Sequence, residues 1–170
     1  MKSHFVLFAG YNAWANRRLY DAAARLSDAD YRADRGVFFK SMHGTLNHLL
    51  AADRIWMRRF TGAGEAPDRL DAILFEDLGP LRAARKAEDA RIAAFVEDLT
   101  DERLAGRFRY RTLSNPREIE QPLAPALAHF FNHQTHHRGQ ARGVHTGLGG
   151  DAPPLNLILF QRETGLGLAE

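Results

Sequence analysis

The histidines of this chain are the residues whose type and spacing point most clearly to chemistry. The chain has eight of them, and five lie between residues 129 and 145. Because residues three or four apart share one face of an α-helix, most of these five form a single polar stripe. The stripe consists of His129, His133, His136, His137 and Gln140. Apolar residues run beside it, so we expect the stripe at the edge of the core, where imidazoles point inward and still meet water.

Two histidines one helical turn apart can bind one metal ion from a single helix. The spacing allows three pairs, namely His129/His133, His133/His136 and His133/His137. His133 belongs to all three pairs and is therefore the ligand that every alternative shares. No glutamate lies between the paired histidines, so the metalloprotease motif is absent. Two nitrogens are too few for a tight site, and a third ligand must come from another helix.

His48 is the best candidate for that third ligand. The apolar pattern predicts a helix over residues 42–61, with Ser41 as its cap and Gly62 at its end. His48 lies at the margin of the apolar sector of this helix, the same position that His133 takes on its own helix. His43 points well away from His48, so we do not expect both to bind one ion. A lone histidine at a core margin is more often simply hydrogen-bonded, and that alternative stays open.

Three further polar residues are expected on inner faces. Asn12 and Asn16 share a stripe with apolar residues of the first helix, and Asp53 lies among leucines of the second. Buried amides need partners, so these asparagines either orient metal-bound water or substrate or, as we favour, bond to a neighbouring helix. For Asp53, pairing with an arginine is favoured over accepting a ligand histidine's N–H.

Composition limits the class of protein. The 170 residues fit one domain, 1–170, and a hydrophobic share of 45% is enough for a sizeable core. There is no cysteine, so a metal must be held by His, Asp or Glu, and a cytoplasmic location is expected. A net charge of +2 gives no support for nucleic acid binding, and no apolar run is long enough to cross a membrane.

Two arginine-rich stretches have structural explanations. Arg54, Arg58 and Arg59 lie mainly on the outer face of the second helix. The arginines of 103–111 alternate along an expected strand, and Glu118 and Glu120 are available opposite them, which suggests cross-strand pairing. Neither stretch predicts a nucleic-acid site.

The pattern of apolar residues predicts an all-α protein. Long amphipathic helices with short connections are typical of a four-helix bundle, here expected to be up-and-down. A change to alternating residues predicts a small β-hairpin before the last long helix. The expected elements are helices 3–26, 42–61, 80–98 and 122–146, a short turn near 27–30, strands around 107–111 and 118–120, and a short last helix at 151–160.

Three segments resemble the DinB family of damage-inducible bacterial proteins. Residues 11–19 read YNAWANRRL, residues 43–56 read HGTLNHLLAADRIW, and residues 132–140 read NHQTHHRGQ. They occur in the family's order and at the expected separation, and the resemblance covers nearly the whole chain. The resemblance implies a four-helix bundle that often dimerises, with one metal ligand on the second helix and two on the fourth.

Carried over by position, the resemblance names His48, His133 and His137 as the metal ligands. It makes His129 and His136 neighbours of the site, together with Gln140, Asn12, Asn16 and Asp53. Relatives include thiol-dependent transferases that use small thiols, and a mycothiol-dependent isomerase. The resemblance therefore implies a small thiol or an electrophilic small molecule as substrate.

Three neutral imidazoles leave an open coordination position, which is typical of catalytic rather than structural metal sites. The sequence thus favours a metal-dependent enzyme of the thiol S-transferase type, or a hydrolase. The alternative is a metal-binding stress-response protein without turnover, because Asp53 is the only inner-face carboxylate that could act as a base. Zinc and nickel are the first choices for the ion, with iron, manganese and copper as alternatives, and all-nitrogen sites suit zinc, nickel, iron and copper alike.

Overall fold

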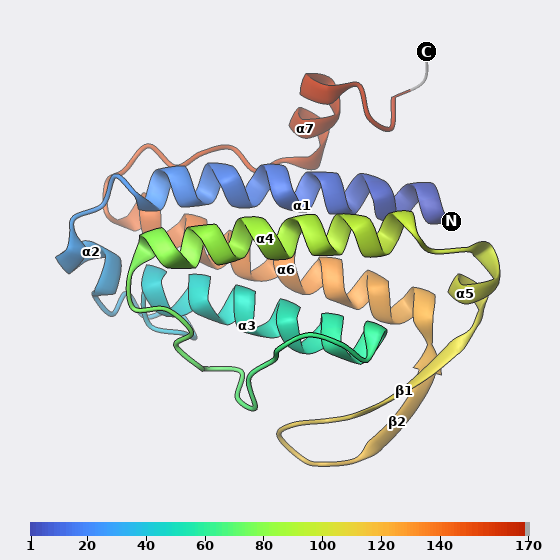
Figure 1. Cartoon of the computed structure of the whole chain (residues 1–170). Helices are drawn as coiled ribbons and strands as arrows, with labels where there is room; N and C mark the ends of the chain where they lie inside the picture. Colours follow the sequence, from blue (N-terminus) through green and yellow to red (C-terminus); the bar gives the residue numbers. More distant parts are fainter. Residues whose placement is uncertain (169–170) are drawn as a thin grey trace.

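The computed structural model describes residues 1–168 and consists mainly of helices packed into a bundle (Figure 1). Its long helices are α1 (Lys2–Ala23), α3 (Met42–Thr61), α4 (Leu78–Glu97) and α6 (Leu123–Gly147). The shorter elements are α2 (Asp28–Arg32), α5 (Asp101–Ala105), β1 (Arg107–Arg111), β2 (Glu118–Pro122) and α7 (Leu157–Thr164). The all-α class and the hairpin before the last long helix are confirmed.

The ends of α3 lie where the sequence predicts them. The hydroxyl of Ser41 accepts a hydrogen bond from the backbone N–H of Gly44 at 3.0 Å, which caps the first turn. Gly62 has φ +72°, a left-handed conformation that a residue with a side chain adopts only with strain. These two residues fix the helix that carries His48.

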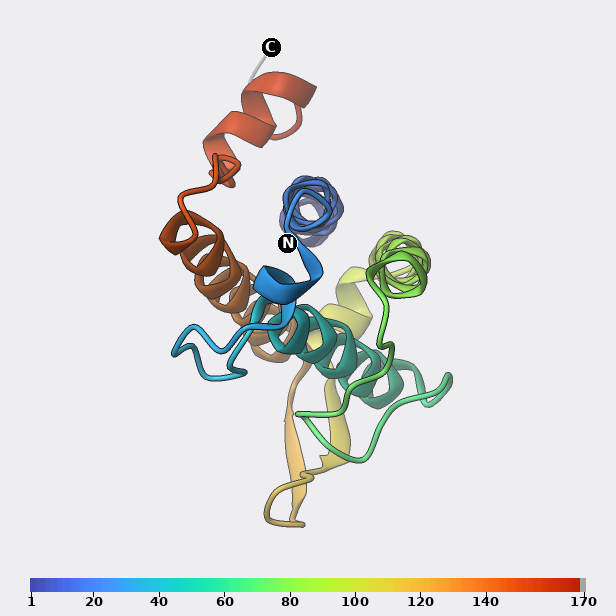
Figure 2. The ribbon, with the colours of Figure 1, turned by 90° about the vertical axis from the view of Figure 1, so that its left-hand side faces the viewer.

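Contacts between side chains give the relative directions of the helices. Asp53 pairs with Arg85, and Phe60 stacks on Phe95, so α3 and α4 run parallel. Helices α1 and α6 are also parallel, with Phe5 against Phe131 and Asn12 against Arg138. Figure 2 looks along α1 and α4 nearly end-on and shows the four long helices around a common centre.

The expected up-and-down order with short connections is wrong in one respect. The segment 62–77 carries the chain back along the bundle, so that α4 starts at the same end as α3 (Figure 1). An extended chain covers about 3.3 Å per residue, so this segment can span α3, whose 20 residues rise about 30 Å. The return segment also passes beside α3, and this brings Leu70 to His48.

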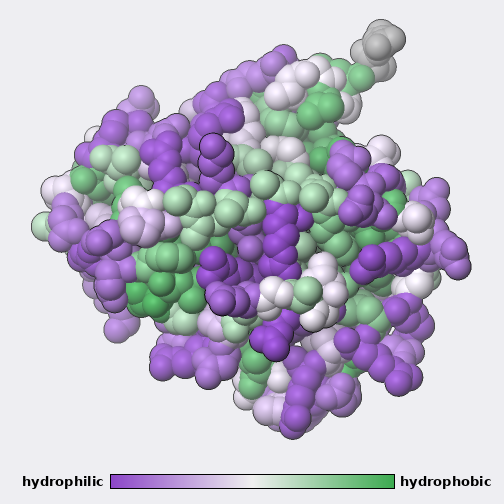
Figure 3. All heavy atoms as spheres, in the orientation of Figure 1, coloured by the Kyte–Doolittle hydropathy of each residue, from purple (hydrophilic) through white to green (hydrophobic). Residues whose placement is uncertain are grey.

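The core lies between the helices and has two hydrophobic halves. Buried polar side chains lie between these halves along the helices, among them Asn12, Asp53 and Arg85. An aromatic-rich half surrounds Phe60 and Phe130, whereas leucines such as Leu46 and Leu50 dominate the other half. On the face seen in Figure 3, hydrophobic atoms form separate patches among hydrophilic side chains rather than one continuous area. Within the described part of the chain, no helix combines the length and apolar character needed to span a membrane.

The hairpin is held by the pairing expected from its charges. Strands β1 and β2 are antiparallel with Arg109 opposite Glu120, and the carboxylate of Glu120 accepts from Arg107 at 2.9 Å and from Arg109 at 2.5 Å. The arginines of β1 are therefore partly neutralised, as the sequence indicates. The hairpin starts at the end of the bundle where α6 begins, and its tip reaches back toward α3 (Figure 1).

Three short helices differ from expectation. The expected turn near 27–30 is the helix α2, which Ser27 caps, and α5, capped by Thr100, was not anticipated. The last helix begins at Leu157 instead of near Asp151, because Pro153 and Pro154 hold the preceding residues extended.

Candidate metal centre

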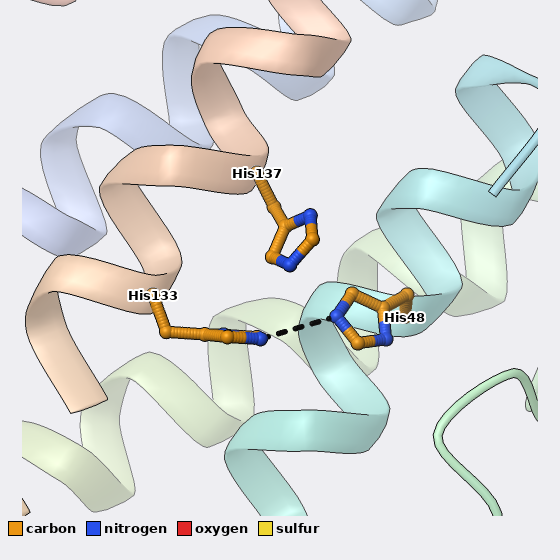
Figure 4. Close-up of side chains that lie close together, drawn as sticks. All are labelled: His48, His133 and His137. Atoms are coloured by element: carbon orange, nitrogen blue, oxygen red, sulfur yellow. Dashed lines mark hydrogen bonds between the residues drawn. The ribbon is translucent and has the colours of Figure 1, made fainter. Parts of the chain in front are cut away.

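Three histidines from two antiparallel helices meet at one point. His48 projects from α3, and His133 and His137 project from α6, with their rings turned toward one another (Figure 4). One nitrogen of each ring lies within 4.8 Å of a nitrogen of each other ring, and the Nε2 atoms of His48 and His133 are 3.3 Å apart. His48 and His137 are buried and His133 is half-buried. The position of His48 on α3 thus selects His137, not His136 or His129, as the partner of His133.

The return segment fixes the protonation of His48. Its Nδ1 lies 2.7 Å from the backbone carbonyl of Leu70. A carbonyl only accepts, so Nδ1 carries the proton and the Nε2 lone pair is free to face the centre. Hydrogen bonds of this kind orient metal-binding histidines in many proteins.

Gln140 does the same for His137. Its side-chain oxygen lies 2.7 Å from Nδ1 of His137, and because this oxygen only accepts, Nδ1 is again the donor. Gln140 is three residues further along α6, one turn away, so the helix itself sets the contact. Two of the three rings therefore present Nε2 lone pairs toward the third.

The surroundings keep all three imidazoles uncharged at neutral pH. Burial lowers the pKa of His48 to about 4, despite the hydrogen bond to Leu70. Burial is the main cause that lowers the pKa of His133 to about 3, and electrostatic repulsion from the nearby rings of His137 and His48 adds to it. The pKa of His137 is lowered as well, mainly by burial. Neutral imidazoles are the form that binds metal ions.

An aromatic ring and a cleft border the triad on different sides. Phe39 stacks on His48 with ring centroids 3.6 Å apart and an angle of 15° between the planes. A cleft of about 450 Å³ reaches His133 and is bounded by Trp56, Leu70 and the hairpin tip 112–115. The triad is therefore covered at His48 and open to a small molecule at His133.

Asn12, Asn16 and Asp53 belong to a second group of polar residues. Both asparagines donate to Asp89 at 2.9–3.0 Å, and Asp53 accepts from Arg85 at 2.6 Å. Among residues 1–168, no hydrogen bond joins these three to the triad. The bonds between helices that were favoured for them are therefore what the structure shows, because buried charges on α4 and α6 offer closer partners.

The other expected neighbours lie around the triad to different degrees. His129 is exposed, with its ring 5.9 Å from that of His133 and 5.2 Å from that of Trp56. His136 is exposed and its Nε2 lies 3.3 Å from the side-chain nitrogen of Gln140. His43 is in hydrogen-bond contact with the carbonyl of Phe75 at 3.1 Å, away from the triad as expected.

Two buried arginines were not predicted from the sequence. Arg85 pairs with Asp53 and, at 2.9 Å, with Asp89, while Arg138 donates to Asn12. Both arginines are 2% exposed. A signal was present, because Arg85 lies four residues after Leu81, and Arg138 seven after Phe131, on the apolar side of each helix. The contacts of Leu70 and Phe39 with His48 depend on loops and had no such signal.

Comparison with known proteins gives the family. Residues 1–166 match the DinB family. The chain belongs to the DinB family. It is also similar to Protein DinB of Bacillus subtilis (strain 168), with 27% identity over 170 residues that cover 91% of this chain and 92% of the relative. The match spans α1 through α7, so it includes every residue of the triad of this DinB-family chain.

The donor set fits a divalent metal ion. An ion about 2.0–2.1 Å from each nitrogen requires nitrogens roughly 3–4 Å apart. The Nε2 atoms of His48 and His133 are 3.3 Å apart, and the three ligand nitrogens all lie within 4.8 Å of one another. The three rings carry no charge, and two of them are fixed by hydrogen bonds on the opposite nitrogen. In this DinB-family protein, three histidines close together could hold one metal ion.

Proposed function

We propose that this protein is a metal-dependent enzyme whose ion is held by His48, His133 and His137. The observation that carries the proposal is the orientation of the triad. The rings of His48 and His137 donate from Nδ1 to Leu70 and Gln140, which leaves their Nε2 atoms facing the centre, and His133 opens to the cleft. A site with three protein ligands and one accessible side is typical of catalytic metals.

The reaction that we propose is transfer of a small thiol to an electrophile, with hydrolysis as the neighbouring alternative. A divalent ion held here would lower the pKa of a thiol or of water at its open position. In the transfer, the sulfur forms a bond to the electrophilic carbon. The displaced group leaves with the electron pair of the broken bond, and the thiol proton passes to solvent. The chain's relationship to the DinB family supports this choice.

The residues of this chain have separate tasks in the proposal. Leu70 and Gln140 hold the rings of His48 and His137 in one orientation, which reduces the reorganisation needed during the reaction. Phe39 covers His48 and excludes water from that side. The cleft beside His133 places the substrate.

Zinc or nickel is our first proposal for the ion. A set of three imidazoles suits zinc, nickel, iron and copper, and the order of affinities alone does not select the native ion. Elemental analysis of protein purified without a histidine tag identifies it. Full occupancy by manganese would contradict this choice, because manganese prefers oxygen ligands.

A second candidate function follows from one observation. None of the residues that line the cleft beside His133 is a carboxylate, which leaves the exposed His129 as the one side chain of the described lining, outside the triad, that could act as a general base. This observation favours a metal-binding stress-response protein without turnover. The two candidates agree on the metal site and differ only in catalysis.

One experiment separates the two candidates. Metal-loaded protein is incubated with a panel of small thiols and an electrophile, and the loss of free thiol is followed. The enzyme predicts thiol consumption that stops in His48→Ala and continues in the matched control His136→Ala, because His136 is exposed and outside the triad. Equal background rates in all three proteins would favour the non-catalytic function.

We also propose that the protein is a cytoplasmic homodimer. The resemblance to dimeric family members and the lack of cysteine support this proposal. The molecular mass in solution, from light scattering, should be twice that of the 19.1 kDa chain. A mass equal to one chain at micromolar concentration would contradict it.

A further inference from the structure

The cleft beside the triad has an unusual charge pattern. It is bounded by helix α3, helix α6 and the hairpin tip, and its volume of about 450 Å³ suits a small molecule. Two arginines, Arg59 and Arg117, line it together with His133, and none of its lining residues is aspartate or glutamate. A cavity lined by two arginines and no carboxylate attracts negatively charged ligands.

Arg59 lacks a charged partner in the structure. Its guanidinium lies 4.6 Å from the ring centre of Trp56 and 4.7 Å from that of Tyr110, between two aromatic faces. Its one hydrogen bond in the described chain goes to the carbonyl of Arg111 at 3.4 Å, which is a weak contact. No carboxylate of residues 1–168 lies within 4.0 Å of it. Burial also lowers the pKa of Arg59, as expected for a partly desolvated cation.

Other enclosed arginines of this protein differ in this respect. Arg85 is buried between the carboxylates of Asp53 and Asp89, which replace the water it loses. The guanidinium of Arg59 is half-buried and leaves most of its N–H groups available. Stacking between Trp56 and Tyr110 holds it in a fixed place without using these donors, so an incoming anion finds them already positioned.

Arg117 adds a second cation from a different element. It lies at the hairpin tip, where its backbone N–H donates to the hydroxyl of Thr112 at 2.9 Å and so closes the turn. Thr112, Ser114 and Asn115 supply further polar groups to the same wall of the cleft. The hairpin therefore brings hydrogen-bonding groups to a cleft whose opposite wall is α3.

We propose that the cleft is a carboxylate-binding subsite, in which Arg59, assisted by Arg117, holds an anionic group of the substrate that reacts at His133. The inference rests on the proposed function, because it names the substrate class of that same site. A guanidinium binds a carboxylate through two parallel hydrogen bonds and so fixes direction as well as position. The hairpin and α3 then select anionic substrates.

Binding of two matched thiols to cobalt-loaded protein tests this subsite. The probes are 3-mercaptopropionate and the neutral 3-mercapto-1-propanol, and their dissociation constants are read from the change in cobalt absorption. We expect the carboxylate to bind about tenfold more tightly or better, since hydrogen bonds to charged groups contribute more than neutral ones. In Arg59→Gln the preference should fall to about onefold, while 3-mercapto-1-propanol binds as before.

The neighbouring Arg58 provides the matched control. Arg58 is exposed and does not line the cleft, so Arg58→Gln removes the same charge one residue away and should keep the preference. Arg59→Lys should keep part of the preference, because it retains the charge and loses the paired geometry. Thermal unfolding of each variant verifies that it is folded. Equal binding of both thiols by the wild type, or equal losses in Arg58→Gln and Arg59→Gln, would overturn the subsite.

Failure of the proposed function gives a different result. In that case neither thiol changes the absorption of fully loaded protein, which contradicts thiol chemistry at the triad. The subsite is then judged by fluorescence of Trp56 in a Trp14→Phe background, because Trp56 stacks on Arg59. Propionate, and not 1-propanol, should change this fluorescence, and Arg59→Gln should abolish the response. No difference between the two compounds would overturn the subsite.

Discussion

Two groups of polar side chains lie between the helices of this bundle, and they are built in opposite ways. In the buried ion network of Asp53, Arg85, Asp89 and Arg138, charges of opposite sign and amide groups face one another. In the triad, three neutral bases turn toward a common centre. The network supplies its own partners, whereas two rings of the triad direct Nε2 lone pairs at the point where we propose that a cation binds.

This difference separates residues that connect the helices from residues that we propose bind a metal ion. Asp89 joins α4 to α1 through Asn12 and Asn16, and Asp53 joins α3 to α4 through Arg85. Burial raises the pKa of Asp53 to about 6, and Arg85 opposes this rise. The triad connects only α3 and α6 and contains no charge. Variants in the two groups should therefore affect different properties.

The largest effect is expected for Asp53→Ala, on the free energy of unfolding. Removing one member of a buried ion pair leaves Arg85 without this counter-charge, which typically destabilises a protein by about 3–5 kcal/mol. Urea unfolding of the metal-free protein measures the loss. The control Asp71→Ala removes an exposed partner of Arg69 and should leave the unfolding midpoint unchanged. A small effect of Asp53→Ala would mean that the network does not hold the bundle.

The next effect concerns the triad. His133→Ala removes one of the three proposed ligands, and we expect metal affinity to fall by roughly 100-fold or more, since changes to groups that only support ligands already cost about 10–100-fold. The stability of the metal-free protein should change little. Competition with a chromogenic chelator measures the affinity. His136→Ala, on the same helix but outside the triad, should retain the wild-type value, and retention of a full equivalent of tight metal by His133→Ala would reject the site.

Much of the scaffold for the triad was predictable, because local signals determine it. Ser41 and Gly62 fix α3, and the stripe of histidines lies on one helix in any case. The direction of α4 was not predictable, since the segment 62–77 has no periodicity. Its composition fits a short connection to an antiparallel helix as well as a long connection back along the bundle to a parallel one. Spacing alone also left three histidine pairs open, and only the position of His48 on the antiparallel helix selects His137.

The buried arginines show a further limit of sequence reasoning. Arg85 and Arg138 occupy core-facing positions, but a charge in such a position is stable only if partners come from other helices. Those partners, Asp53 and Asn12, were identified as inner-face residues in need of donors or cations. The sequence thus contained both halves of the network, and their pairing required the packing of α1, α3, α4 and α6.

A moderate effect is expected at Gln140. Gln140→Ala removes the acceptor that holds the ring of His137, and metal affinity should fall by about tenfold, the lower end of the range for such supporting groups. Gln140→Glu, which offers a charged acceptor, should restore affinity. Chelator competition is again the measurement. If both variants bind like the wild type, the orientation of His137 is set by packing rather than by this hydrogen bond.

The smallest change in metal affinity is expected when the pH is lowered moderately below neutral. The folded-state pKa values of His48 and His133, about 4 and 3, lie below the value of about 6.5 in an unfolded chain. Stability from these groups is therefore fully present above pH 6.5 and is lost as pH falls toward 4 and 3. Protons likewise compete little with a metal ion above pH 5.

Metal affinity should accordingly fall less than about tenfold between pH 7.5 and pH 5.5. Three histidines with ordinary pKa values would each lose about tenfold over this range, or about a thousandfold together. A synthetic peptide of residues 129–141 provides the control, because its solvated histidines keep ordinary pKa values and should lose affinity steeply. A thousandfold loss in the folded protein would show that the triad opens to solvent and takes up protons before the ion network of Asp53 and Arg85 gives way.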